Sequence, residues 1–306
     1  MRLKSVLRRG VAAAVIAGIV VSSGIPAYAG TWNIADGDIT VKAGDAEGKN
    51  KVSQGETIDK DDTNTVITGE SKEHTVTIDT SKGDVDVTFD DLKIDVSGKK
   101  EGDGSDDGPV RESKAAVTVQ GGGDATVELD GDNELKSGGY NAGLEKNEHE
   151  SKGTLTIKDD NDTKGALTAE GGFGGAGIGG GQWGNGTVTI SGDSKIESAL
   201  GGGLSAGIGG GAVGNGTVSI SGNATIENAQ GGKDGAGIGG GYGYGQSGTG
   251  DITIEGNTTV NATGGMGSAG IGNGTDAGGN NGQITIRGTK DSSPTVNATG
   301  GIAEED

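Results

Sequence analysis

The stretch GAGIGGG at residues 175–181 decides the fold, because close copies of it follow at nearly constant spacing. The alanines of the four copies are separated by 30, 30 and 33 residues. A disordered glycine-rich tract does not keep alanine and isoleucine in register over four units, so the stretch predicts a repeat fold. The further copies are SAGIGGG at 205–211, GAGIGGG at 235–241 and SAGIG at 268–272.

Each unit contains two further segments that alternate apolar and polar residues. Thr187-Val188-Thr189-Ile190 follows the first copy, and a segment around Ile196 completes the unit. Alternation with period two is typical of β-strands. Three short strands per unit predict one coil of a parallel β-helix. Stacked coils would place the isoleucines of the copies in one internal column, with strands about 4.8 Å apart. The isoleucines of the four copies are Ile178, Ile208, Ile238 and Ile271. The later copies of the second segment are 217–220, 251–254 and 283–286. The residues that correspond to Ile196 in the third segment are Ile226, Val260 and Val296.

The composition excludes a thick hydrophobic core. Of 306 residues, 68 are glycine, 3 are proline, none is cysteine and 3% are aromatic. Isoleucine, valine, leucine and phenylalanine together number 56, about 18% of the chain, which is in the range of disordered proteins. Collagen is also excluded, because the glycines have no three-residue period. We therefore expect an all-β fold: a right-handed, single-stranded parallel β-helix of about seven to nine coils, with roughly 30 residues and three short strands per coil.

The first 29 residues have the pattern of a secretory signal peptide. Four basic residues precede the apolar run 11–21, and Ala27-Tyr28-Ala29 offers a cleavage site before Gly30. The alternative is an uncleaved membrane anchor, but the run is short for a membrane span. We expect a secreted protein in which residues 30–72 form a polar N-terminal cap and residues 73–306 form the β-helix, glycine-rich from residue 171.

The net charge of the secreted chain limits the classes of partner that it can bind. The whole chain has 24 basic and 44 acidic residues. Removing a leader with 4 basic and no acidic residues leaves 20 basic and 44 acidic groups, a net charge of −24. Nucleic acid and anionic membranes are therefore poor partners, because both require a basic patch. We expect a monomer whose stability comes from the backbone ladder, since no disulfide is available.

The chain resembles a known family in the segments before and including the first glycine cluster. The segments 133–139, 153–157 and 165–169, leading into 175–181, are similar to secreted bacterial carbohydrate-binding domain proteins. The resemblance covers roughly residues 74–301 and implies right-handed parallel β-helices akin to pectate lyases. It also implies polysaccharide as the ligand. No catalytic residue of a lyase can be matched onto a position of this sequence.

Aromatic residues are rare enough to identify a candidate sugar site. Trp183 follows the first glycine cluster, and Tyr242 with Tyr244 follows the third. Flat rings beside a backbone without side chains suit the apolar faces of sugar rings. The alternative is that the rings only cover a turn, and the second coil has Ala212-Val213 at this place. The three rings are the predicted carbohydrate-binding residues.

An acidic run gives a candidate cation site. Asp159, Asp160 and Asp162 are close in sequence, and Ca²⁺ binds six to eight oxygen atoms from flexible loops. The alternative is a solvated loop of an acidic protein. A base for lyase chemistry is missing, because Lys195 is replaced by threonine in later coils. We therefore expect a non-catalytic polysaccharide-binding protein, secreted and retained at the cell surface through its ligand. A structural or adhesive spacer without a sugar site and a polysaccharide lyase or hydrolase are the alternatives.

Overall fold

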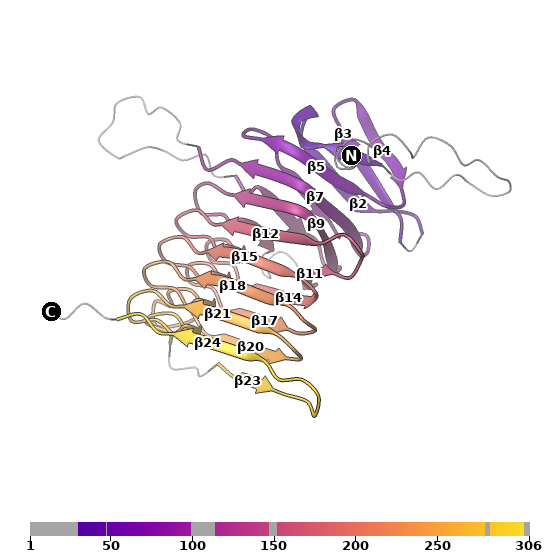
Figure 1. Ribbon diagram of the computed structural model, residues 1–306. Coiled ribbons are helices and arrows are strands. Elements are labelled where there is room, and N and C mark those ends of the chain that lie inside the picture. Colours follow the sequence, from indigo (N-terminus) through magenta and orange to yellow (C-terminus); the bar gives the residue numbers. More distant parts are fainter. Residues whose placement is uncertain (1–29, 47, 99–113, 147–151, 279–281, 303–306) are drawn as a thin grey trace, which may run out of the picture.

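The protein is a parallel β-solenoid of about seven turns, with about 33 residues per turn (Figure 1). The predicted all-β class and the stacked coils are confirmed, although each coil is slightly longer than expected. The predicted signal peptide lies outside the described residues, among which no helix is long and apolar enough to cross a membrane. The computed structural model describes the whole chain except residues 1–29, 47, 99–113, 147–151, 279–281 and 303–306.

Each later coil contributes one strand to a 10-stranded sheet, sheet B, and two strands to a 14-stranded sheet, sheet A. In the glycine-rich coils the strands of sheet B are only two residues long. In chain order, the parallel strands of sheet B are β2 (Ile39–Ala43), β6 (Val76–Asp79), β8 (Val117–Gln120), β10 (Leu144–Lys146), β13 (Ile178–Gly179), β16 (Ile208–Gly209), β19 (Ile238–Gly239) and β22 (Ile271–Gly272).

Sheet A holds two stacks of strands that lie side by side and join at the long strand β9 (Ala125–Lys136) (Figure 1). The strands that precede β9 in the stack are β1 (Thr31–Asn33), β5 (Val66–Ser71) and β7 (Val85–Asp95). One stack continues with β11 (Leu155–Asp159), β14 (Gly186–Gly192), β17 (Gly216–Ile220), β20 (Gly250–Glu255) and β23 (Ile284–Arg287). The other continues with β12 (Gly165–Glu170), β15 (Lys195–Leu200), β18 (Thr225–Gln230), β21 (Thr259–Thr263) and β24 (Thr295–Thr299).

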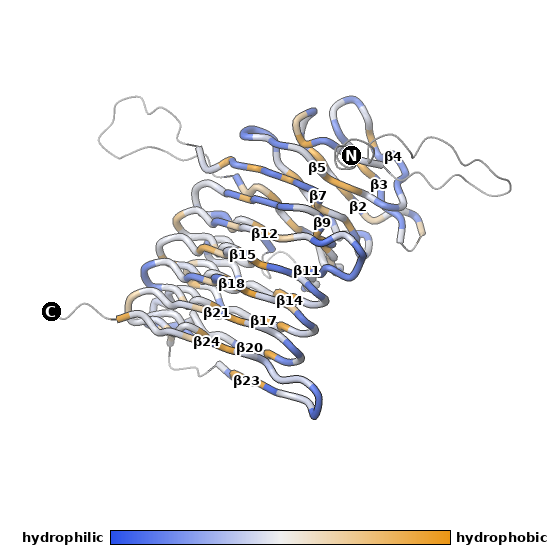
Figure 2. Tube along the Cα trace, in the orientation of Figure 1, coloured by the Kyte–Doolittle hydropathy of each residue, from blue (hydrophilic) through white to orange (hydrophobic). Residues whose placement is uncertain are grey.

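The predicted isoleucine column exists inside the solenoid. Ile178 is in register with Ile208, Ile208 with Ile238, and Ile238 with Ile271. All four side chains belong to one buried cluster that extends through the described coils. Along the strands, hydrophobic residues alternate with polar ones, whereas the glycine loops have intermediate hydropathy (Figure 2). A core one side chain thick therefore needs few large residues per coil.

The glycine that follows Ile178, Ile208 and Ile238 is required by the close approach of the next coil. Gly209 has a φ of +128°, a region that favours glycine. A Cβ atom there would lie 2.1 Å from the carbonyl oxygen of Gly239. The repeated Ile-Gly pair thus combines a core side chain with a backbone that the next coil can contact.

The N-terminal segment 30–72 continues the solenoid and also closes its end. Strands β2 and β5 pair in parallel with the following coils. The short 3-10 helix η1 (Ile34–Asp36) and the antiparallel strands β3 (Asn50–Gln54) and β4 (Thr57–Asp62) are added at the edge. The segment is not wholly polar, because Trp32 and Ile34 are buried in the core.

Candidate functional site

Two sets of glycine loops flank the two-residue strands of sheet B. The incoming loops lead into these strands, and the outgoing loops lead away from them. Each outgoing loop donates a backbone hydrogen bond to the incoming loop of the preceding coil, as from Ala212 N to Gly174 O at 2.9 Å and from Tyr242 N to Leu204 O at 2.8 Å. The loops of neighbouring coils therefore form one connected surface. The incoming loops are 138–142, 171–175, 201–205, 231–235 and 264–268, and the outgoing loops are 181–184, 211–214, 241–248 and 274–278.

The predicted ring residues lie on the outgoing loops, at a place that recurs from coil to coil. Trp183 N donates to Ala212 O at 2.7 Å, and Val213 N donates to Tyr242 O at 2.8 Å. Trp183 and Val213 also share a positive φ, 64° and 62°. Trp183 and Val213 are thus equivalent positions, and the third residue of this row is Gly243, whose N–H donates to Thr275 O. Tyr242 and Tyr244 flank that glycine, two coils beyond Trp183.

The third outgoing loop is longer than the two before it and carries both tyrosines. It extends from Gly241 to Gly248, whereas the loop before it extends from Gly211 to Gly214. The rings of Tyr242 and Tyr244 pack edge to face, with centroids 4.5 Å apart. Trp183 and Tyr244 are 60% and 57% exposed, so both rings present a face to solvent.

The hydroxyl group of Tyr242 lies 3.3 Å from Oδ2 of Asp276 on the next outgoing loop and donates a hydrogen bond to it. Partial burial and the negative charge of Asp276 raise the pKa of Tyr242 above its ordinary value. The phenol therefore stays protonated at neutral pH and retains its ability to donate.

Two exposed rings that the sequence analysis missed lie on the incoming loops. Tyr140 and Phe173, on the first two incoming loops, pack edge to face with centroids 6.3 Å apart. Gln182, the neighbour of Trp183, donates its N–H to Tyr140 O at 2.8 Å. Both rings follow a Gly-Gly pair that recurs in every later coil, and aligning that pair would have found them.

A groove of about 780 Å³ runs along the incoming loops from Phe173 to Ile302. Its floor consists of the recurring Gly-Gly pairs. A Cβ atom on Gly202 would lie 1.7 Å from Gly172 O, and one on Gly232 would lie 1.6 Å from Gly202 O. The floor is thus bare backbone that cannot accept a side chain. The groove crosses five coils and is about 19 Å long. Its other side chains are Glu170, Leu200, Gln230, Lys233 and Met266.

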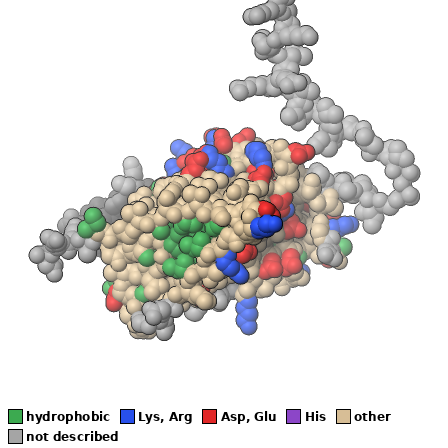
Figure 3. Space-filling view, turned by 60° about the horizontal axis from the view of Figure 1, so that its bottom comes forward, with side chains coloured by type: hydrophobic (Ala, Val, Ile, Leu, Met, Phe, Trp, Pro, Cys, Tyr) green, Lys and Arg blue, Asp and Glu red, His purple; other side chains and the backbone are tan. Residues whose placement is uncertain are grey.

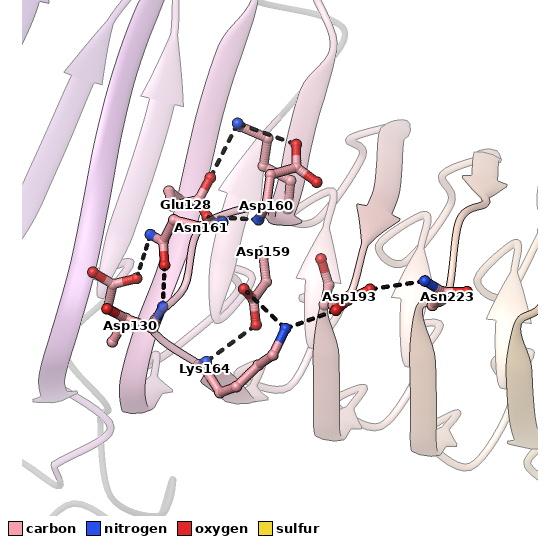
Figure 4. A network of polar contacts seen from close by, with 12 residues as sticks. Glu128, Asp130, Asp159, Asp160, Asn161, Lys164, Asp193 and Asn223 are labelled. Carbon is pink, nitrogen blue, oxygen red and sulfur yellow. Dashed lines mark hydrogen bonds and ion pairs between the residues drawn. The ribbon is translucent and has the colours of Figure 1, made fainter.

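The predicted cation site is not assembled from its three carboxylates. Asp159 is buried and accepts a hydrogen bond from the N–H of Gly165 at 3.2 Å, whereas Asp160 lies 3.3 Å from Nζ of Lys158 (Figure 4). Asp162 is exposed in the same loop. Within the part of the chain that the structure describes, no group of three or more Asp, Glu, His or Cys side chains could hold a metal ion.

The acidic run takes part instead in a polar ladder between coils. Nζ of Lys164 lies 3.9 Å from Oδ1 of Asp159 and 2.7 Å from Oδ2 of Asp193. Nδ2 of Asn223 donates to Oδ1 of Asp193 at 2.9 Å (Figure 4). Burial raises the pKa of Asp159 above the ordinary carboxyl value, against the effects of Gly165 and Lys164. These contacts tie three coils together along one edge.

Lys195, the cation weighed as a catalytic base, is paired with acidic side chains. Its Nζ lies 2.8 Å from Glu197 and 3.2 Å from Glu227, and these bonds raise the pKa of the lysine. An ammonium group held in its charged form is a poor base.

The comparisons with known proteins add no assignment. No protein-family model, no curated protein and no solved structure matches the chain. The class of the protein is therefore defined by its fold, a parallel β-solenoid with a surface of glycine loops.

Proposed function

We propose that this protein is a secreted, non-catalytic polysaccharide-binding protein that acts outside the cell or at the cell surface. The observation that carries the proposal is the glycine-floored groove with exposed rings beside it. Flat rings stack on the apolar faces of sugars, and a bare backbone floor lets a chain approach closely.

The dimensions and the chemistry of the groove favour an extended glycan chain. The groove is open to solvent along about 19 Å, which is long enough for several sugar residues. Glu170, Gln230 and Lys233 offer hydrogen-bond acceptors and donors for hydroxyl groups. Phe173 forms one end of the groove and packs against Tyr140, so these two rings extend the groove at that end.

Trp183, Tyr242 and Tyr244, on outgoing loops two coils apart, are the second part of the proposed site. Trp183 and Tyr242 are two coils apart, roughly 10 Å, on the scale of a disaccharide. The protonated phenol of Tyr242 adds a polar group beside the ring of Tyr244. A glycan running parallel to the solenoid axis would contact rings on alternate coils.

A glycan array with the full chain, read with and without Ca²⁺, tests this function. We expect binding to one class of polysaccharide and loss of most affinity in the triple alanine variant of Trp183, Tyr242 and Tyr244. Ile58→Ala, which changes an exposed side chain on the distant strand β4, is the matched control. Failure to bind any glycan would favour the alternative that the protein is a structural or adhesive spacer without a sugar site.

The enzymatic alternative has its own test. A lyase acting on polygalacturonate with Ca²⁺ generates unsaturated products that absorb ultraviolet light, and a hydrolase releases reducing ends. We expect neither with common plant and cell-wall polysaccharides, because Lys195 is held in ion pairs. If the protein turns over a polysaccharide and a single Lys, Arg, Asp or Glu substitution abolishes that turnover, the protein is an enzyme and the non-catalytic function is wrong.

A further inference from the structure

One apolar side chain interrupts a polar row along the groove. Glu170, Leu200 and Gln230 are register partners on β12, β15 and β18, and all three line the groove. Each follows a buried alanine, so the three side chains point away from the core. The row continues with Thr263 on β21. Leu200 is therefore an apolar, half-buried residue between polar neighbours in an outward-facing row.

The ring of Phe173 lies across the glycine floor from Leu200. A Cβ atom on Gly203 would lie 2.9 Å from Cε2 of Phe173, so the ring leans over the next coil and covers this glycine. The edge-to-face contact with Tyr140 supports the ring in this position, and Phe173 is still 55% exposed. We call Leu200, Gly203 and Phe173 the apolar subsite of the groove.

The apolar subsite differs from the hydrophobic patch at the end of the last described coil, which comes forward in Figure 3. Ile284 and Ile286 at that end continue the internal core, and they are 47% and 50% exposed because β23 is the last described strand of its stack. Leu200 and Phe173 belong instead to coils with a neighbour on each side. Their exposure is therefore a property of the groove and not of an uncovered core.

The next coil along the groove is polar at the same two places. Gln230 and Lys233 correspond to Leu200 and Gly203 one coil earlier, and both are exposed. Successive coils are about 4.8 Å apart, which is about half the roughly 10 Å length of a disaccharide. A glycan that follows the groove would thus place one sugar residue on the apolar subsite. Its neighbour would lie beside an amide and an ammonium group that bind hydroxyl groups.

The charge around the groove favours a neutral ligand. Residues 165–286 include eight acidic and two basic residues, a net charge of −6. One of the two basic residues, Lys195, is paired with acidic side chains. Within the groove the charges of Glu170 and Lys233 cancel. A glycan with a carboxylate on every residue would be repelled by the surrounding acidic coils, whereas a neutral glycan would not.

We propose that the apolar subsite binds one residue of a neutral glycan by the apolar face of its sugar ring, with Phe173 as the stacking residue. Gln230 and Lys233 hydrogen-bond the hydroxyl groups of the neighbouring residue. The inference rests on the proposed glycan binding and extends it, because it names the class of glycan and adds binding residues that are not on the outgoing loops.

Fluorine NMR of the full chain labelled with fluorophenylalanine observes this contact directly. The chain has two phenylalanines, and the other one, Phe89, is fully buried. The neutral probes are oligosaccharides of cellulose, laminarin, mannan and chitin, and the acidic probe is oligogalacturonate. We expect at least one neutral probe to shift the signal of Phe173 while the signal of Phe89 stays in place. Oligogalacturonate should shift neither signal.

Variants of the apolar subsite measure its share of the affinity. Phe173→Ala and Leu200→Gln should each raise the dissociation constant of the neutral probe several-fold, whereas Phe173→Trp should retain binding. Gly203→Leu should abolish most binding, because it fills the subsite. The nearest atoms to its Cβ all belong to the Phe173 ring, so the melting temperature should stay close to that of the parent. Gly122→Leu, where nothing lies within 4 Å of a Cβ atom, is the matched control.

The possible failures of this inference and of the proposed function are distinguishable. A neutral probe that binds Phe173→Ala and Gly203→Leu as tightly as the parent would overturn the subsite and leave glycan binding in place. Binding of oligogalacturonate alone would overturn the neutral class. If neither these probes nor any glycan of the array binds, the proposed function fails, and the subsite fails with it.

Discussion

The backbone N–H of Gln182 donates to the carbonyl oxygen of Tyr140 at 2.8 Å, which joins an outgoing loop to the incoming loop of the preceding coil. The same contact recurs one coil further on between Ala212 and Gly174. It brings the loop of Trp183 into contact with the loop of Tyr140, which lies more than 40 residues earlier in sequence. The ring surface is thus a product of the coil stacking.

Filling the gap in the row of rings should strengthen glycan binding. Val213 has nearly the same φ as Trp183 and a corresponding hydrogen bond, so the backbone there accepts a large ring. We expect Val213→Trp to raise the affinity several-fold, since stacking contributes about 0.5–1.5 kcal/mol per ring. Trp183→Ala should lower it by a similar factor. Titration calorimetry with the glycan found by the array measures the affinities of both variants. If both variants bind as tightly as the parent, the rings only cover a turn and do not bind sugar.

The floor of the groove should tolerate no side chain. A Cβ atom on Gly232 would lie 1.6 Å from Gly202 O, whereas one on Gly122 has no atom within 4 Å. We expect Gly232→Ala to reduce the free energy of unfolding by about 2 kcal/mol or more, because backbone must move. Gly122→Ala should change it by less than about 0.5 kcal/mol. Urea denaturation measures the free energy of unfolding of both variants. Equal losses of stability in the two variants would show that the floor of the groove is loosely packed.

The isoleucine column should be intolerant of charge at its centre. Ile208→Asp places an unpaired carboxylate between Ile178 and Ile238, and we expect a loss of several kcal/mol, on the order of 3–5. Ile58→Asp, at an exposed position, is the control and should be nearly neutral. Thermal melting followed by circular dichroism compares them. A parent-like melting temperature for Ile208→Asp contradicts the column.

The buried carboxyl group of Asp159 should give the stability a specific pH dependence. Its pKa is raised in the folded chain by burial, so ionisation costs more in the folded than in the unfolded state. This group therefore reduces stability as the pH rises from the ordinary carboxyl value through the raised one. Asp159→Asn removes the charge and keeps an acceptor for Gly165.

We expect Asp159→Asn to be more stable than the parent by about 1 kcal/mol at neutral pH, with the difference shrinking in acid. Chemical denaturation at several pH values measures the two curves. A variant that is less stable than the parent at neutral pH would show that the contacts with Lys164 outweigh the cost of burial.

Periodicity was sufficient to predict the coils and their register. Ile178 and Ile208 are paired because a core one residue thick accepts only in-register repeats. The two-residue length of β13 was not predictable from alternation, because Gly179 and Gly180 carry no side chain that distinguishes strand from loop. The contact between incoming and outgoing loops depends on backbone hydrogen bonds across coils, which leave no apolar pattern in the sequence.

The candidate site was predicted in part for the same reason. Trp183 and Tyr244 could be singled out because they are rare residues that follow the glycine clusters, and both are exposed. Their role in sugar binding stays a prediction. The groove was not found, since its floor is glycine and its depth depends on how successive loops stack. The acidic run was expected to gather around a cation, but Asp159 points inward to Gly165 while Asp160 pairs with Lys158.

The four extra residues of the third outgoing loop leave the register of the solenoid unchanged. Ile238 still pairs with Ile271, and Val218 with Ile252. Because each coil contacts only its neighbours, such an insertion is absorbed where it occurs. The loop of one coil can therefore change in length and sequence without altering the other coils. A library randomised at residues 242–247 would vary the displayed loop while the rest of the solenoid stays constant.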